Sequence, residues 1–244
     1  MVRGKFSLGP KAEGVLHWHL MPRFLLIALM MLVVLRAEDL VDARAILESA
    51  RLNPFGSQIQ LRAQIRVGSA KTPFLIRTGY GAVSYEFSEP KESWILRPGE
   101  ESPALQHSNG NRLQNIQDFT RTVRSDLVTL EDLALRFLYW KNPRLLGEET
   151  IRTRRAWKIE MNTAEPGSPY GAVRVWIDRE SLALLRMEGF DRGGRLVKRF
   201  EVVSAQRLQD QWMLKQMRIE KLDPETRKIL GLAYVEVLGT VEEP

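Results

Sequence analysis

The most regular pattern along the chain is an alternation of apolar and polar residues over residues 57–67. From Ile59 to Val67 every second side chain is apolar, and glutamine or arginine fills the positions between them. Because successive side chains of a β-strand point to opposite faces of its sheet, the pattern predicts a long, half-buried antiparallel strand. Similar runs predict further strands at residues 73–80, 83–87, 91–97, 157–161, 173–177, 182–190, 195–203, 211–220 and 228–237.

Two segments repeat their apolar residues at helical spacing instead. The first covers residues 38–52 and ends at Asn53-Pro54, because proline lacks a backbone N–H and disfavours helix in the residue before it. The second begins at Thr129, which forms a capping-box pattern with Asp132, and carries an apolar stripe up to Trp140. We therefore predict one helix before the first strand and one near the middle of the chain.

The segments between the predicted strands carry turn signals. Asp191-Arg-Gly-Gly194 and Asp223-Pro-Glu-Thr226 each separate two strands and are typical of hairpin turns. Residues 98–112 are polar, with proline, glycine, serine and asparagine, and are predicted to form a loop. Closely spaced strands, few helices and no interior linker predict a mainly β protein of the α+β kind, with one large, curled antiparallel sheet in a single domain.

The N-terminal segment differs in composition from the rest of the chain. An uncharged apolar run of 12 residues, 24–35, follows the basic Met21-Pro-Arg23. This length suits a signal-peptide core of about 7–15 residues better than a membrane span of about 20 residues. We therefore expect residues 1–37 to be a signal peptide with its true start at Met21, and residues 38–244 to be the exported protein. Leu35 fits the cleavage pattern before Glu38 poorly, so an uncleaved anchor is the alternative.

The charge of the chain is concentrated in this segment. A net charge of +6 and an isoelectric point near 9.7 are typical of proteins that bind nucleic acid or an anionic membrane. Five of the 36 basic residues but only one of the 30 acidic residues lie in the predicted signal peptide, which leaves about +2 for the rest. Nucleic acid is therefore not expected as a partner. The absence of cysteine excludes disulfides, thiolate metal sites and a lipid-anchoring cysteine.

No residue pattern points to catalysis. His107 is the single histidine after residue 37, has no accompanying nucleophile or metal-ligand spacing, and is interpreted as a solvated loop residue. The adjacent carboxylates Glu131-Asp132 and Glu148-Glu149 diverge in either a helix or a strand, so neither pair forms an acid–base couple. We therefore expect a protein that is not an enzyme, with no metal site and no cofactor.

Several segments in the second half resemble the outer-membrane lipoprotein-sorting protein family, the LolA-like superfamily. In order and spacing they are Leu130-Glu-Asp-Leu133, Leu146-Gly-Glu-Glu149, the Trp157 strand, Tyr170-Gly-Ala-Val-Arg-Val-Trp-Ile-Asp178, Glu188-Gly-Phe-Asp191 with Gly194 and Lys198, and the segment from Trp212 to Met217. The resemblance implies an incomplete, strongly curved antiparallel β-barrel, with helices as plug and lid over an apolar cavity. It also implies a monomeric periplasmic carrier of lipoprotein acyl chains, served by an inner-membrane releasing complex and an outer-membrane acceptor. A relative that keeps the fold and binds another lipid is the alternative.

Candidate ligand-contacting residues follow from apolarity within this implied fold. Three alternating sets are expected to face the cavity or the core: Ile59, Leu61 and Ile65; Trp157, Ile159 and Met161; and Val173, Val175 and Ile177. The stripe of Leu133, Phe137 and Leu138 is expected to act as a lid helix. The alternative is a periplasmic sensor or interaction module with the same fold, whose apolar residues fill the interior and leave no cavity.

Overall fold

The computed structural model describes residues 42–52, 58–110, 112–163, 167–208 and 211–241. The predicted signal peptide, its start and cleavage site, and Pro54 lie outside the described residues. Across the described part of the chain, no helix has the length and apolar character that crossing a membrane requires.

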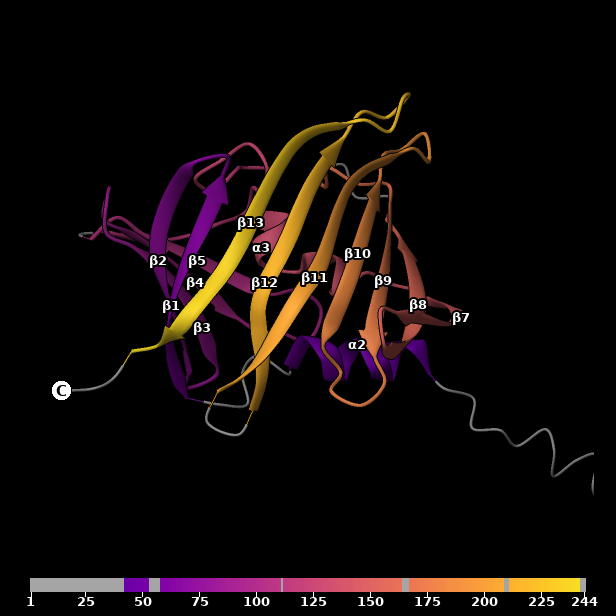
Figure 1. The fold of residues 1–244 in the computed structure, drawn as a ribbon, viewed down its shortest axis with the longest axis horizontal. Helices are drawn as coiled ribbons and strands as arrows, with labels where there is room; N and C mark the ends of the chain where they lie inside the picture. The colour runs from indigo at the N-terminus through magenta and orange to yellow at the C-terminus, as the bar shows by residue number, and fades with distance from the viewer. Residues whose placement is uncertain (1–41, 53–57, 111, 164–166, 209–210, 242–244) are drawn as a thin grey trace, which may run out of the picture. The chain divides into compact units, whose positions relative to one another are not determined.

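One antiparallel sheet contains thirteen strands (Figure 1). The strands are β1 (Ile59–Val67), β2 (Ala70–Gly79), β3 (Ala82–Phe87), β4 (Glu92–Arg97), β5 (Ala104–Ser108), β6 (Leu113–Asn115), β7 (Arg144–Ile151), β8 (Arg154–Asn162), β9 (Ala172–Asp178), β10 (Leu184–Phe190), β11 (Leu196–Leu208), β12 (Gln211–Leu222) and β13 (Ile229–Thr240).

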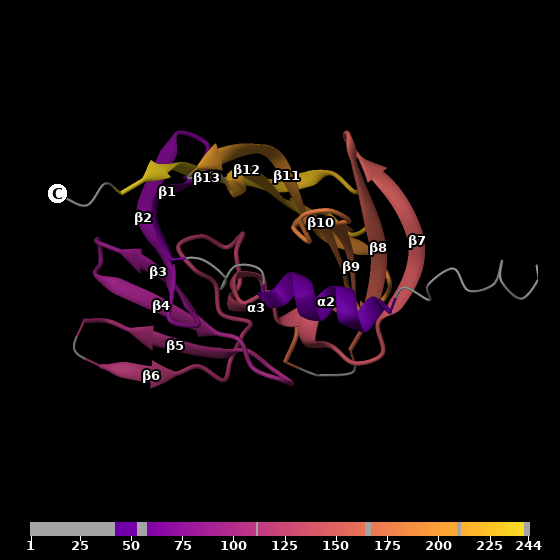
Figure 2. The ribbon, with the colours of Figure 1, turned by 90° about the horizontal axis from the view of Figure 1, so that it is seen from below.

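The first and last strands pair with each other inside the sheet. From the β1–β13 pair, consecutive strands lead outward to two edges, β6 on one side and β7 on the other. Residues 116–143 connect these edges across the concave side, where they form α3 (Leu130–Leu133) and the 3₁₀-helix η2 (Arg136–Tyr139) (Figure 2). The sheet therefore curves without closing, and the predicted incomplete, curved antiparallel barrel with few helices is confirmed.

Irregular pairing adds to the curvature of the sheet. The register of β1 against β13 shifts between Arg62 and Ala63, and that of β11 against β12 shifts on both sides of Ser204. An extra residue in one strand bends it and increases its local twist. These irregularities lie in the central strands, where the sheet wraps over its interior.

The first described helix, α2 (Ala43–Leu52), plugs part of that interior. Its buried face consists of Ala43, Ile46, Leu47 and Ala50, which match the predicted apolar stripe. These residues share one core cluster with inward-facing residues of β8 and β9. In Figure 2 the helix crosses the open side of the curved sheet beside β9.

The predicted loop at residues 98–112 is wrong, because it contains β5. Only Leu105 in this strand is fully buried, so its sequence carries little alternation. The interpretation of His107 as solvated is wrong as well. Its ring stacks on Trp94 with 4.1 Å between centroids, its Nε2 lies 3.1 Å from a carboxylate oxygen of Glu92, and its side chain is 17% exposed.

The helix predicted from Thr129 to Trp140 is interrupted. The capping box is confirmed, since the Thr129 hydroxyl accepts a hydrogen bond from the Asp132 amide and the Asp132 carboxylate accepts one from the Thr129 amide. The helix ends after one turn because Leu135 adopts a left-handed conformation with φ of 47°. Leu133 therefore lies in α3, whereas Phe137 and Leu138 lie in η2, so the three do not form one lid helix.

A carboxylate joins the central strands on the outer face. Glu236 of β13 accepts hydrogen bonds from Arg66 and Gln64 of β1 and from Gln216 of β12. Partial burial opposes its ionisation, but the hydrogen bonds and the arginine charge prevail and lower its pKa from 4.5 to about 2. The group therefore stabilises the fold above pH 4.5, and this contribution is lost as the pH falls towards 2.

We expect Glu236→Gln to reduce the free energy of unfolding at pH 7 by about 3 kcal/mol, because the linked pKa shift is removed. The difference from the unchanged protein should shrink between pH 4.5 and pH 2, as measured by urea denaturation at a series of pH values. Glu48→Gln on the exposed face of α2 is the control, with an expected change within about 0.5 kcal/mol. A pH-independent difference for Glu236→Gln would contradict this assignment.

Candidate functional site

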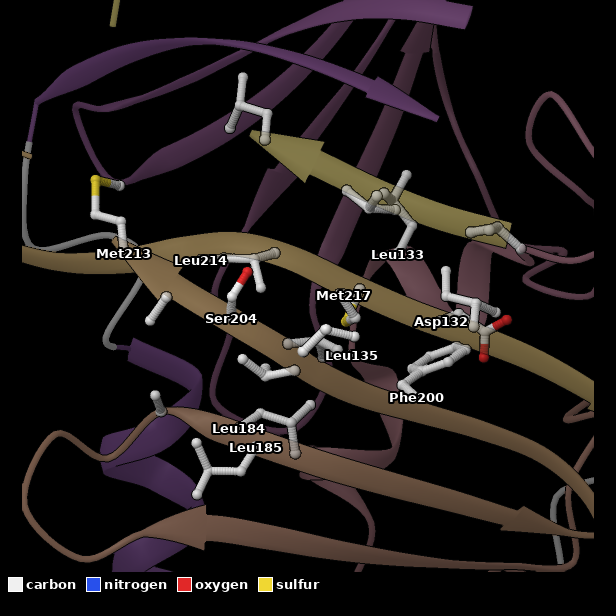
Figure 3. A pocket seen from close by; sticks show the side chains of 18 of the residues that line it. Asp132, Leu133, Leu135, Leu184, Leu185, Phe200, Ser204, Met213, Leu214 and Met217 are labelled. Carbon is white, nitrogen blue, oxygen red and sulfur yellow. The ribbon is translucent and has the colours of Figure 1, made fainter. Parts of the chain in front are cut away.

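A cavity of about 610 Å³ lies against the inner face of the sheet, between β11, β12 and the connection that carries α3 (Figure 3). Most of its lining is apolar. The apolar residues are Ile65, Phe74, Ile76, Phe87, Val123, Val128, Leu133, Leu135, Ile151, Ala183, Leu184, Leu185, Phe200, Val202, Val203, Ala205, Met213, Leu214, Met217, Ile219 and Val235. A concave, mainly apolar space with a few polar groups is the usual form of a small-molecule site.

Two long neighbouring strands form one wall of the cavity. Its lining extends from Phe200 to Ala205 on β11 and from Met213 to Ile219 on β12. At a rise of about 3.4 Å per residue, these segments span roughly 17–20 Å. The irregular pairing around Ser204 turns successive β11 residues towards the cavity, which a regular strand would send to opposite faces. The cavity is therefore long enough to hold an extended chain.

The cavity reaches the protein surface where β10 and β11 separate. Their pairing ends at Arg186 and Glu201, although β11 continues to Leu208. Beyond this pair, the lining includes Leu184 and Leu185 of β10, Val203 to Ala205 of β11, and Arg152 and Thr153 of the β7–β8 turn. We call this set of residues the portal.

The segment between the sheet edges forms the opposite side of the cavity. Leu133 at the end of α3 and Leu135 just after it both line the cavity. The left-handed backbone at Leu135 ends the helix turn and redirects the chain into η2. The part of the connection that faces the cavity is therefore a short helix turn and the bend that follows it.

A buried polar cluster holds this segment to the sheet. The Asp132 carboxylate accepts hydrogen bonds from Lys198 Nζ at 2.7 Å, from Tyr170 Oη at 2.6 Å and from the Thr129 hydroxyl at 2.8 Å. The Asp132 and Lys198 side chains are only 1% and 8% exposed. We call these four residues the latch. Figure 3 shows Asp132 beside Phe200, towards the opposite end of the cavity from Met213.

The latch fixes the protonation of its tyrosine. Burial, followed by the charge of Asp132, raises the pKa of Tyr170 well above 10, so its hydroxyl remains a proton donor to the carboxylate. The ring fits only because its neighbour is glycine: a Cβ on Gly189 would lie 2.5 Å from the Tyr170 ring. Four residues from separate motif segments thus meet at one place, and they are Asp132, Tyr170, Gly189 and Lys198. Packing and hydrogen bonding between them explain why the motif contains all four.

The residues predicted to face the cavity, the core or the lid divide among three environments: the cavity lining and two packed clusters. Ile65 and Leu133 line the cavity. Ile59 and Leu61 pack in a smaller cluster with Val237. The others pack in the core cluster shared with α2, and they are Trp157, Ile159, Met161, Val173, Val175, Ile177, Phe137 and Leu138. Their contact with a ligand stays a prediction.

The sequence pattern did not single out the lining residues of β11 and β12. Both strands were predicted, but Val202, Val203 and Ala205 are consecutive or near-consecutive apolar residues that show no clear inner face. The same holds for Met213 and Leu214. Such a break in alternation is itself the signal of a bulge. It could have identified this part of β11 and β12 as an irregular stretch of the sheet.

Within the described ranges, no group of three or more histidine, aspartate and glutamate residues has the arrangement needed to hold a metal ion. The polar side chains of the lining are Asp132 at one end and Arg152, Thr153, Arg154, Ser181 and Ser204 towards the other, together with the Tyr85 hydroxyl. This arrangement suits binding of an elongated amphiphile.

We expect Asp132→Asn to lower the free energy of unfolding by about 3–5 kcal/mol, because Lys198 is left as an uncompensated buried charge. Adding Lys198→Met should restore much of the loss by removing that charge. Urea denaturation of the single and double variants measures both effects. The control is Glu148→Gln, which breaks only exposed ion pairs and should leave the free energy of unfolding nearly unchanged. Equal losses for Asp132→Asn and Glu148→Gln would contradict the role of the latch.

A family model with the description "-like: Uncharacterized protein" matches residues 111–238, which is more than half of the chain. No curated protein matches the sequence. Among solved structures, an outer-membrane lipoprotein-sorting protein domain from Vibrio parahaemolyticus is similar, with 14% identity and a TM-score of 0.63. The match covers 82% of this chain and 93% of that one.

Two further solved structures share the fold. A LolA superfamily protein from Nitrosomonas europaea has 16% identity and a TM-score of 0.56, covering 84% of this chain and 96% of its own. A DUF1329 family protein from Desulfovibrio piger has 18% identity and a TM-score of 0.54, covering 80% and 89%. These identities show the fold, whereas the family model shows membership. The chain belongs to the family that this model describes, and its fold is LolA-like.

Proposed function

We propose that the protein is a periplasmic carrier that binds the acyl chain of a lipid or lipoprotein in its apolar cavity. The observation that carries this proposal is the cavity of about 610 Å³ beneath β11 and β12. The similarity of the fold to that of a lipoprotein-sorting domain supports it.

The energetics of acyl-chain transfer favour such a cavity. Each buried CH₂ group contributes about 0.8 kcal/mol, so an acylated molecule does not leave a membrane unaided. A carrier must offer comparable apolar surface and yet keep that surface away from water. Here the sheet forms one wall of the cavity. The segment held by the latch forms the opposite wall through Leu133 and Leu135.

The alternative function, a sensor or interaction module on the same fold, predicts a filled interior. The part of the interior beneath β8 and β9 is indeed filled, because α2 packs there. The part beneath β11 and β12 is open to the cavity. This division favours the carrier, in which α2 stabilises the barrel and the remaining space receives the ligand.

Export and exchange partners complete the proposal. Residues 1–37 act as the signal peptide, residues 38–244 form one exported domain, and the monomeric carrier receives its cargo at the inner membrane and delivers it to an outer-membrane acceptor. Fractionation of cells that produce the full chain should place a protein starting at Glu38 in the periplasm, as read by intact mass. Retention of residues 24–35 in a membrane fraction would contradict cleavage.

Occupancy of the cavity can be tested by acyl-chain uptake. The purified protein should bind a fluorescent fatty-acid analogue, and Met217→Glu should weaken binding at least about tenfold, because it places a carboxylate in the apolar lining. Ser204→Phe should also weaken binding, by occupying the space itself. Fluorescence titration measures the affinity, and circular dichroism checks the fold of each variant.

Leu238→Glu is the matched control for these variants. Leu238 lies on β13, is 57% exposed and is not part of the cavity lining. Uptake should therefore match that of the unchanged protein. Unchanged uptake by well-folded Met217→Glu and Ser204→Phe, or no uptake by the unchanged protein, would refute the proposed site.

A further inference from the structure

We propose that the ligand is an acyl lipid with an anionic headgroup, a carboxylate or a phosphate, whose chain lies in the cavity and whose headgroup is bound by Arg152 at the portal. This inference rests on the proposed function. It adds the charge of the headgroup and the residue that contacts it.

The portal gives the cavity an opening in the wall of the sheet. Past Arg186 and Glu201, β10 and β11 are no longer hydrogen-bonded to each other. Leu184 on one strand and Val203 on the other line the cavity beyond that point. Figure 3 shows Leu184 and Leu185 on the neighbouring strand, away from the Asp132 end. A chain can therefore lie along β11 while its polar end remains at the portal.

The charges of the lining differ between its two ends. Asp132, the single acidic residue of the lining, already accepts hydrogen bonds from Lys198, Tyr170 and Thr129. Among the described lining residues the cations are Arg152, which belongs to the portal, and Arg154, two residues further along the same hairpin. An anionic headgroup therefore meets a cation at the portal, whereas the Asp132 end offers only a carboxylate that Lys198 already compensates. This difference favours placing the headgroup at the portal.

Arg152 and Arg154 have different structural roles. Arg154 donates two hydrogen bonds, of 3.0 and 2.6 Å, to the buried carboxylate of Asp178, and it also pairs with Glu180 at 3.0 Å. Its loss would leave Asp178 uncompensated. Arg154 is therefore needed to hold the hairpin to β9.

Arg152 is held more loosely. Its side chain is 53% exposed and lies 3.5 Å from Glu201 Oε1, while Glu201 Oε2 accepts hydrogen bonds from Arg186 at 3.1 and 2.8 Å. Arg152 can turn to a ligand and leave Glu201 compensated. A guanidinium binds a carboxylate or a phosphate through two parallel hydrogen bonds. Thr153 and Ser204 also belong to the portal, and a hydroxyl side chain can donate or accept a hydrogen bond.

The test compares headgroups on one chain. Hexadecanoate, hexadecyl phosphate and hexadecanol compete against a fluorescent acyl probe, with the full exported protein and with Arg152→Gln. We expect at least one of the anions to compete about tenfold better than hexadecanol, and Arg152→Gln to remove that preference while hexadecanol competes as before. A preference for hexadecanoate would identify the headgroup as a carboxylate, and a preference for hexadecyl phosphate would identify it as a phosphate.

Arg155→Gln is the matched control. Arg155 lies on the same hairpin, is 70% exposed, pairs with Glu148 and is not part of the lining. It should keep the preference for the anions, as should Arg152→Lys in part. Equal competition by all three compounds, or a preference that survives Arg152→Gln, overturns this inference and leaves the carrier function standing. Failure of all three to compete overturns the carrier function as well.

Discussion

The buried carboxylate of Asp132 connects the two parts of the molecule that enclose the cavity. The sheet has two unpaired edges, and the segment that links them must cross the concave side without strand pairing. That segment is held by the bonds from Asp132 to Lys198 and Tyr170 and by its own capping box. Because a buried ion pair is favourable only with both partners present, this geometry is a strong constraint on the position of the segment.

The interior is divided into a packed part and an open part. Beneath β8 and β9, α2 supplies the side chains that complete a close-packed core. Beneath β11 and β12, apolar side chains surround an open space instead. An empty apolar space forfeits the packing contacts that would otherwise stabilise the fold, so a protein retains one where binding requires it. The packing contacts of the filled part thus offset the stability that the open part forfeits.

Bulges and the separation of β10 from β11 determine where the cavity opens. Strand β10 begins at Leu184, whereas β11 continues to Leu208, so β10 cannot cover the whole of β11. The pairing stops at Arg186 and Glu201, and the irregularity at Ser204 bends β11 away. The β7–β8 turn then brings Arg152 to the opening. The end of the β10–β11 pairing therefore provides the opening, and the β7–β8 turn provides its charge.

The alternation of apolar residues was sufficient to predict the half-buried strands, as in β1, where Leu61 and Ile65 face inward and Arg62 faces outward. It failed where burial is not periodic. Strand β7 lies at an edge and is exposed on both faces, and β5 buries only Leu105, so neither has a two-residue period. Local helical spacing also could not reveal the interruption at Leu135, because packing of the connection against the sheet decides it.

The sequence by itself determined the meandering sheet, its hairpin turns, the capping box at Thr129 and the resemblance to a lipoprotein-sorting fold. Those features depend on interactions between residues close in the chain, or on the two-residue period of strands. Tertiary structure alone decided which apolar residues fill the core and which line the cavity. It also brought Asp132 to Lys198 and Arg152 to the portal. These outcomes depend on contacts between distant segments, which strand curvature and helix packing create.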